Sequence, residues 1–134
     1  MSKQNLVKII VADDHDLYRK GTKIFINDTK GLKVTNEYNC GNALLKSVHL
    51  EHNDILILDI SMPDISGIDI LKILNKRKLK IKTIILSMHN SLPIIKKAFK
   101  YGANSYVLKS SSPKEIIKAI KHVHKNGFYV STYK

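Results

Sequence analysis

Acidic side chains stand directly after two apolar runs of the sequence. Asp13 and Asp14 follow the run 7–12, and Asp59 follows the run 55–58. If both runs are strands of one parallel sheet, their carboxyl ends meet at the same edge and bring three carboxylates together. Carboxylates about 4 Å apart repel one another by roughly 4 kcal/mol per pair at an effective dielectric near 20. Such a cluster favours a bound cation, and its oxygen ligands point to Mg²⁺, or else Mn²⁺, rather than zinc.

Two further polar residues stand at the ends of apolar runs. Ser87 ends the fourth run, and Lys109 follows the fifth. A cation and a lysine neutralise the oxygens of a transferring phosphoryl group, and an ionised aspartate attacks phosphorus without a general base. We predict Asp59 as this nucleophile because it follows the most apolar run, which leaves Asp13 and Asp14 for the metal. One acid after a strand is more often a helix cap, but four placements at one edge favour a shared site.

Five short apolar runs, each followed by a segment with helical spacing, predict βα units and a mainly parallel sheet. These runs cover residues 7–12, 32–38, 55–58, 83–86 and 105–108. The third and fourth are almost unbroken β-branched and leucine runs, which predicts strands buried on both faces. The second alternates apolar and polar residues, which predicts an edge strand.

The first helical segment has a distinct apolar stripe. Leu17, Gly21, Ile24 and Phe25 recur at i, i+4, i+7 and i+8 and fall on one face of a helix. This spacing predicts a helix after the first strand.

The last helical segment has well-marked ends. Ser112, Pro113 and Glu115 stand at capping-box spacing and predict a helix beginning at Pro113. Asn126-Gly127 predicts its end. The buried stripe is expected to comprise Ile116, Ile120 and Val123, with the lysines of this helix on other faces.

Length and composition indicate one domain. The chain has 134 residues, and its one cysteine, Cys40, cannot form an internal disulfide. We find no signal peptide and no membrane span, and expect a cytoplasmic protein. Residues 1–71 hold eight basic and ten acidic residues, whereas residues 72–134 hold fifteen and one. Solvated helix faces are the simpler interpretation of the lysines, and a docking face for a partner or DNA is the alternative.

The candidate site residues resemble, in order and spacing, the receiver domain of bacterial two-component response regulators. The resemblance covers nearly the whole chain. The matching positions are Asp13-Asp14, Asp59 within Leu58-Asp59-Ile60-Ser61-Met62-Pro63, Gly67, Ser87, Tyr106 and Lys109. Val11-Ala12-Asp13-Asp14-His15, Leu86-Ser87-Met88-His89 and Lys109-Ser110 further resemble the NarL/LuxR-type subfamily. Members of that subfamily usually continue into a C-terminal helix-turn-helix domain.

The resemblance implies a flavodoxin-like (βα)5 fold, a three-layer α/β sandwich. Its parallel five-stranded sheet would have the order 2-1-3-4-5, which agrees with an edge position for the second strand. Residues 1–134 would form a single receiver domain, and any DNA-binding output domain would lie beyond this chain.

The resemblance also implies a role for each site residue. Asp59 would take a phosphoryl group from a partner sensor histidine kinase. Asp13, Asp14, Asp59 and the backbone carbonyl of Ser61 would hold Mg²⁺. The protein would be a signalling domain rather than an enzyme, able to lose its own phosphoryl group.

A conformational switch is implied as well. Ser87 and Lys109 would bind the phosphoryl oxygens, and Tyr106 would follow inward. This would change the surface of the fourth helix, fifth strand and fifth helix, where such regulators meet partners or dimerise. His89, close to the pocket mouth, would tune hydrolysis of the phosphoaspartate. The other interpretation of Tyr106 is an edge residue with its hydroxyl in water.

One departure from the family pattern is Ser110, where many receivers have a proline after a cis bond. A cis Lys109-Ser110 bond would cost about 3 to 4 kcal/mol, so either the site bears this strain or the loop differs.

Three alternatives remain from the sequence: a stand-alone receiver, a haloacid-dehalogenase-like phosphatase and a basic nucleic-acid-binding module. The phosphatases resemble Asp-x-Asp, whereas this chain has Ser61 at the second acidic position and little length for a cap domain. The binding module would lack interleaved aromatic residues.

Overall fold

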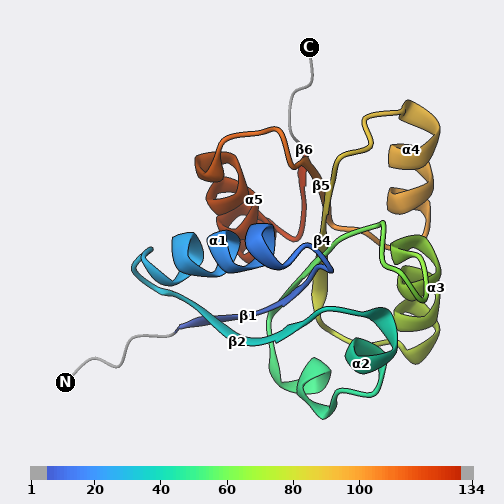
Figure 1. Ribbon diagram of the computed structural model, residues 1–134, viewed down its shortest axis with the longest axis horizontal. Helices are drawn as coiled ribbons and strands as arrows, with labels where there is room; N and C mark the ends of the chain where they lie inside the picture. The colour runs from blue at the N-terminus through green and yellow to red at the C-terminus, as the bar shows by residue number, and fades with distance from the viewer. Residues whose placement is uncertain (1–5, 131–134) are drawn as a thin grey trace.

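A computed structural model describes residues 6–130 as one parallel sheet with helices on both faces (Figure 1). Residues 1–5 and 131–134 of the predicted domain lie outside the described part. The strands are β1 (Val7–Ala12), β2 (Leu32–Tyr38), β3 (Ile55–Leu58), β4 (Lys82–Ser87), β5 (Ser105–Leu108) and β6 (Tyr129–Val130). The helices are α1 (Asp16–Asn27), α2 (Gly41–Leu45), α3 (Gly67–Arg77), α4 (Leu92–Lys100) and α5 (Pro113–Asn126), with a 3₁₀ turn η1 (Val48–His52).

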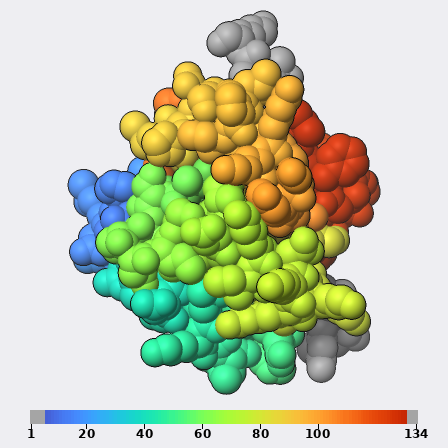
Figure 2. Space-filling model, turned by 90° about the vertical axis from the view of Figure 1, so that its right-hand side faces the viewer, coloured from blue at the N-terminus to red at the C-terminus, as the bar shows by residue number. Residues whose placement is uncertain are grey.

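The helices form two layers around the sheet. One core cluster packs residues of α1 and α5, such as Ile26 and Ile120, against one face of the strands. The other packs residues of α2, α3 and α4, such as Leu44 and Ile70, against the opposite face. Figure 2 shows the outside of this second layer, with α3 between α2 and α4. All four residues of β3 are buried, as expected for a central strand.

The sheet confirms the predicted order and extends it by one strand. The order is β2-β1-β3-β4-β5-β6, so β2 is the edge strand that its alternating sequence predicts. The prediction of five strands missed β6, which pairs in parallel with β5 through Ser105 with Tyr129 and Tyr106 with Val130. A two-residue strand has no periodicity of its own, because the pairing and not the local sequence defines it.

Helix α1 forms where predicted, and it buries a face other than its apolar stripe. Leu17 is 87% exposed and Ile24 70%, whereas Arg19, Thr22 and Ile26 are buried. The face that carries Leu17, Gly21, Ile24 and Phe25 is therefore exposed. Arg19 is accommodated inside because its guanidinium donates to the Asp13 carbonyl at 2.8 Å and to a Glu37 carboxylate oxygen at 2.8 Å.

Helix α5 begins at Pro113 and ends with Gly127 at a φ of +93°, as predicted. Its stripe of Ile116, Ile120 and Val123 is buried. The predicted capping box is not formed, because the Ser112 side chain makes no capping hydrogen bond. The Glu115 carboxylate instead accepts from the Tyr129 hydroxyl at 2.7 Å, which ties α5 to β6.

Among the described helices, none combines the length and the apolar character that crossing a membrane requires.

Candidate functional site

The carboxyl ends of the central strands carry the candidate site. Asp13 and Asp14 follow β1, Asp59 follows β3, and Lys109 follows β5. Backbone hydrogen bonds continue past the strand ends, from the Asp59 amide to the Ala12 carbonyl at 3.0 Å and from the Lys109 amide to the Ser87 carbonyl at 2.8 Å. These bonds fix the residues against neighbouring strands. The predicted convergence is found: potential ligand atoms of Asp13, Asp14, His15 and Asp59 all lie within 4.8 Å of one another.

Lys109 is the cation of this cluster. Its Nζ lies 2.8 Å from Asp13 Oδ2 and 3.5 Å from Asp59 Oδ2, and all three side chains are almost fully buried. The ammonium also lies 4.7 Å from the centre of the Tyr18 ring. Together, burial and the charges of Asp13 and Asp59 raise the pKa of Tyr18 to about 12. The cluster contains one lysine and three aspartates, so it has an excess of negative charge.

Asp59 has an acceptor oxygen with no donor. Its Oδ1 accepts from the Ser61 amide at 3.2 Å, whereas its buried Oδ2 has no hydrogen-bond partner. Burial raises the pKa of Asp59, Lys109 lowers it, and the Asp13 charge raises it again. A buried carboxylate oxygen without a donor fits a bound cation or phosphoryl group, because leaving it unpaired is costly. The donor set of Asp13, Asp14 and Asp59 thus fits a hard divalent ion.

Gly67 shapes the loop after Asp59. A Cβ at this position would lie 2.7 Å from the Asp59 carbonyl oxygen, so only glycine lets α3 begin against this backbone. Gly67 therefore permits close packing of the two backbone segments.

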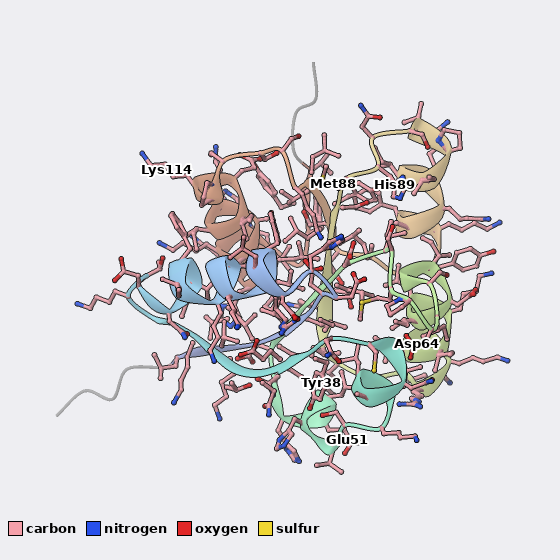
Figure 3. The ribbon with its side chains drawn as sticks, viewed as in Figure 1. Tyr38, Glu51, Asp64, Met88, His89 and Lys114 are labelled. Carbon is pink, nitrogen blue, oxygen red and sulfur yellow. The ribbon has the colours of Figure 1, made fainter. Side chains whose placement is uncertain are left out.

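Asp64 serves the same loop from its other side. It lies between α2 and α3 in Figure 3, and its carboxylate accepts from the amides of Gly41 and Asn42 at 2.8 and 2.7 Å. These hydrogen bonds lower the pKa of Asp64. Asp64 therefore fixes α2 and is not part of the acidic cluster.

The segment after β4 holds Ser87, His89 and Tyr106 in one network. Ser87 Oγ accepts from the His89 amide at 2.9 Å, and the Tyr106 hydroxyl donates to the His89 carbonyl at 2.7 Å. Tyr106 is 1% exposed, and burial raises its pKa, so the interpretation with its hydroxyl in water is wrong. Figure 3 shows Met88 and His89 together on this segment. The His89 ring lies on the Asp59 side, with Nε2 3.0 Å from Ser61 Oγ.

The residue that sequence reasoning missed is His15. Its Nδ1 lies 3.1 Å from Asp13 Oδ1, 3.4 Å from Asp14 Oδ1 and 3.6 Å from Asp59 Oδ2. A search for regular metal-ligand spacing among histidines does not find it. The available signal was its position directly after the acidic pair at a strand end.

The Lys109–Ser110 bond is trans, since the described residues contain no cis peptide bond. The two possibilities left open at this position are thereby decided: the loop differs from that of receivers with a cis bond.

The fold and the site define a class: an open, parallel α/β domain with an acidic, lysine-bearing pocket at the carboxyl edge of its sheet. The chain belongs to the response regulator receiver domain family, whose model matches residues 9–121. This match favours the receiver interpretation over the phosphatase and the nucleic-acid-binding module.

The relatives point to one branch of this family. The chain is 30% identical over 127 residues to the response regulator UvrY of Escherichia coli K12, covering 95% of this chain and 58% of that protein. It is 32% identical over 126 residues to the transcriptional regulatory protein UhpA of Salmonella typhimurium LT2, covering 94% of this chain and 63% of that one. The chain thus spans about three fifths of the length of these relatives.

Solved structures agree. A LuxR-family two-component response regulator from Aurantimonas sp. SI85-9A1 has a TM-score of 0.87 at 27% identity, with 94% of this chain and 89% of that chain covered. A LuxR-family DNA-binding response regulator from Staphylococcus aureus has a TM-score of 0.83 at 27% identity, with 89% and 99% covered. The chain is therefore a receiver domain of the NarL/LuxR kind, a signalling domain.

Proposed function

We propose that Asp59 accepts a phosphoryl group from a phosphohistidine of a partner sensor kinase in a Mg²⁺-dependent reaction. The observation that carries this proposal is the buried Oδ2 of Asp59, which has no hydrogen-bond donor and lies 3.5 Å from Lys109 Nζ. Asp13, Asp14, Asp59 and the Ser61 carbonyl would hold the ion. When bound, Mg²⁺ supplies positive charge that neutralises phosphoryl oxygens.

The transfer exchanges one bond for another. A carboxylate oxygen of Asp59 forms a bond to phosphorus as the phosphorus–nitrogen bond of the donor breaks, and the released imidazole takes a proton from solvent. Lys109 stabilises the charge on the transferring group from its fixed position between Asp13 and Asp59. Ser87, once released from the His89 amide, would donate its hydroxyl to the phosphoryl oxygens.

The kinase would dock on a groove beside the pocket. This groove has a volume of about 760 Å³ and shares His15 and Lys109 with the pocket. The rest of its lining is mostly apolar and includes Leu17, Phe25 and Met88. Leu17 and Met88 are 87% and 71% exposed, so the groove offers an apolar contact next to the phosphoacceptor. A helix that presents a phosphohistidine to Asp59 would cover it.

The output belongs to the same proposal. Coupling would pass from Ser87 through the His89 backbone to Tyr106, which pairs with β6, and so to the surface of α4, β5 and α5. In the intact regulator this change would control dimerisation and transcription through a DNA-binding domain outside the described residues. His89, hydrogen-bonded to Ser61, would tune the loss of the phosphoryl group. A cytoplasmic location is part of the proposal.

The test is labelling by acetyl phosphate with Mg²⁺, followed by intact-mass measurement. We expect wild type to gain one phosphoryl group and Asp59→Asn to gain none, because an amide oxygen is a poor nucleophile. Equal labelling of both proteins would refute the role of Asp59.

Leu17→Ser is the matched control. Its side chain is exposed and lines only the docking groove, so a small donor should label this variant as fully as wild type.

A further inference from the structure

His15 places a nitrogen atom inside the acidic pocket. Its backbone amide donates to Asp13 Oδ1 at 2.9 Å, which holds the residue over the acidic pair. Its ring Nδ1 is also 3.1 Å from Lys109 Nζ. Nδ1 therefore lies among one ammonium group and three carboxylates, and it faces the pocket. An imidazole nitrogen that carries no proton is the form that binds metals.

The spacing of the four side chains matches a coordination shell. Ligand atoms about 2.1 Å from an octahedral ion and at right angles to one another are about 3 Å apart. Nδ1 lies 3.1, 3.4 and 3.6 Å from oxygens of Asp13, Asp14 and Asp59. The Asp59 oxygen in this set is the buried one without a hydrogen-bond partner. The candidate ligand atoms of the four residues all lie within 4.8 Å of one another.

The chemistry of a mixed set differs from that of oxygens alone. Carboxylate, carbonyl and water ligands suit Mg²⁺, whereas imidazole favours later first-row metals, whose affinities rise from Mn²⁺ to Ni²⁺. We propose that His15 is a fourth side-chain ligand, so that the pocket binds Mn²⁺ and Ni²⁺ through one nitrogen and three carboxylates and Mg²⁺ through its oxygens only. This inference rests on the metal pocket of the proposed function and adds a metal preference to it.

Pulsed electron paramagnetic resonance of the Mn²⁺-loaded chain tests the nitrogen ligand directly. We expect ¹⁴N couplings from a coordinated imidazole in wild type and their loss in His15→Ala. His89→Ala is the matched control, because it removes the other histidine near Asp59 and should leave the signal unchanged. Mn²⁺ bound to wild type without nitrogen coupling would overturn the inference.

Calorimetric titration tests the preference. Loss of a ligand should weaken Ni²⁺ binding to His15→Ala by about tenfold or more, and Mg²⁺ binding by less than about twofold. An equal loss for both metals would overturn the inference. Acetyl phosphate labelling of His15→Ala with Mg²⁺ keeps the two proposals apart. If Asp59 is labelled but the wild-type protein shows no nitrogen coupling, only the ligand role of His15 is refuted. If nitrogen coupling is seen but Asp59 is not labelled, only the proposed function is refuted.

Discussion

Two charged clusters lie near α1, and they differ in how many charged donors their carboxylates have. The acidic pocket of Asp13, Asp14, His15, Asp59 and Lys109 has one lysine for three acids. The second cluster, here called the α1–β2 ion cluster, comprises Asp16, Arg19, Lys23 and Glu37. In it, Glu37 Oε1 lies 2.8 Å from Arg19 Nε, and Glu37 Oε2 lies 2.8 Å from Lys23 Nζ.

The pKa values follow the number of donors. Hydrogen bonds from Lys23 and Arg19 lower the pKa of Glu37 and outweigh its partial burial. Burial raises the pKa of Asp59, and one lysine at 3.5 Å does not outweigh it. Both Glu37 oxygens of the α1–β2 ion cluster already have a charged donor, so we expect this cluster to stabilise the fold without a ligand. The acidic pocket has negative charge that its one lysine does not balance, and such a pocket is suited to bind a cation.

The largest expected change in stability comes from breaking the α1–β2 ion cluster. Glu37→Ala would leave the buried Arg19 without its main partner and lower the free energy of unfolding by about 2 kcal/mol. Urea unfolding at neutral pH measures this change. The matched control is Glu51→Ala, an exposed acid, which should change stability by less than about 0.5 kcal/mol. Equal effects of the two substitutions would show that the α1–β2 ion cluster does not stabilise the fold.

In the acidic pocket, removal of a carboxylate charge is expected to raise the free energy of unfolding rather than lower it. Asp59→Asn removes a buried charge whose Oδ2 has no hydrogen-bond donor, so the free energy of unfolding should rise by about 1 kcal/mol at neutral pH without divalent ions. The same urea experiment measures it. Asp69→Asn is the control, because Asp69 is exposed and its oxygen is 3.8 Å from Lys72 Nζ. A destabilised Asp59→Asn would mean that Lys109 already compensates the charge.

The sequence predicts the acidic pocket better than its surroundings, for physical reasons. Asp13, Asp59 and Lys109 could be placed because each follows an apolar strand, and parallel strands end at one edge. His15 could not, because its contact with three carboxylates depends on how the chain turns after β1. The buried face of α1 could not be predicted, because periodicity records only where apolar residues lie. It does not show that the buried Arg19 side chain has hydrogen-bond partners in the Asp13 carbonyl and the Glu37 carboxylate.

The α1–β2 ion cluster shows the same limit. Glu37 lies on β2 and Arg19 and Lys23 on α1, so their meeting depends on how the helix packs across the strand. Long-range pairs of this kind leave no local pattern. β6 is a further example, since its two residues become a strand only by pairing with β5.

The smallest effects, but the sharpest distinction, come from pH. The folded-state pKa of Glu37 is lowered, so its stabilising contribution is present above the unfolded value of about 4.3 and is lost as pH falls. The folded-state pKa of Asp59 is raised, so stability is highest with the proton bound and is lost as pH rises from about 3.9 through the folded value. We therefore expect two trends in urea unfolding between about pH 4 and pH 8. The loss of stability in Glu37→Gln, relative to wild type, should become smaller as pH falls. The gain of stability in Asp59→Asn should become larger as pH rises. The quantity to compare is the free energy of unfolding of each variant minus that of wild type. As pH rises, this difference should become more negative for Glu37→Gln and more positive for Asp59→Asn. A change of the same sign in both variants would contradict the contrast between the two clusters, because burial and pairing would then act alike on the two carboxylates.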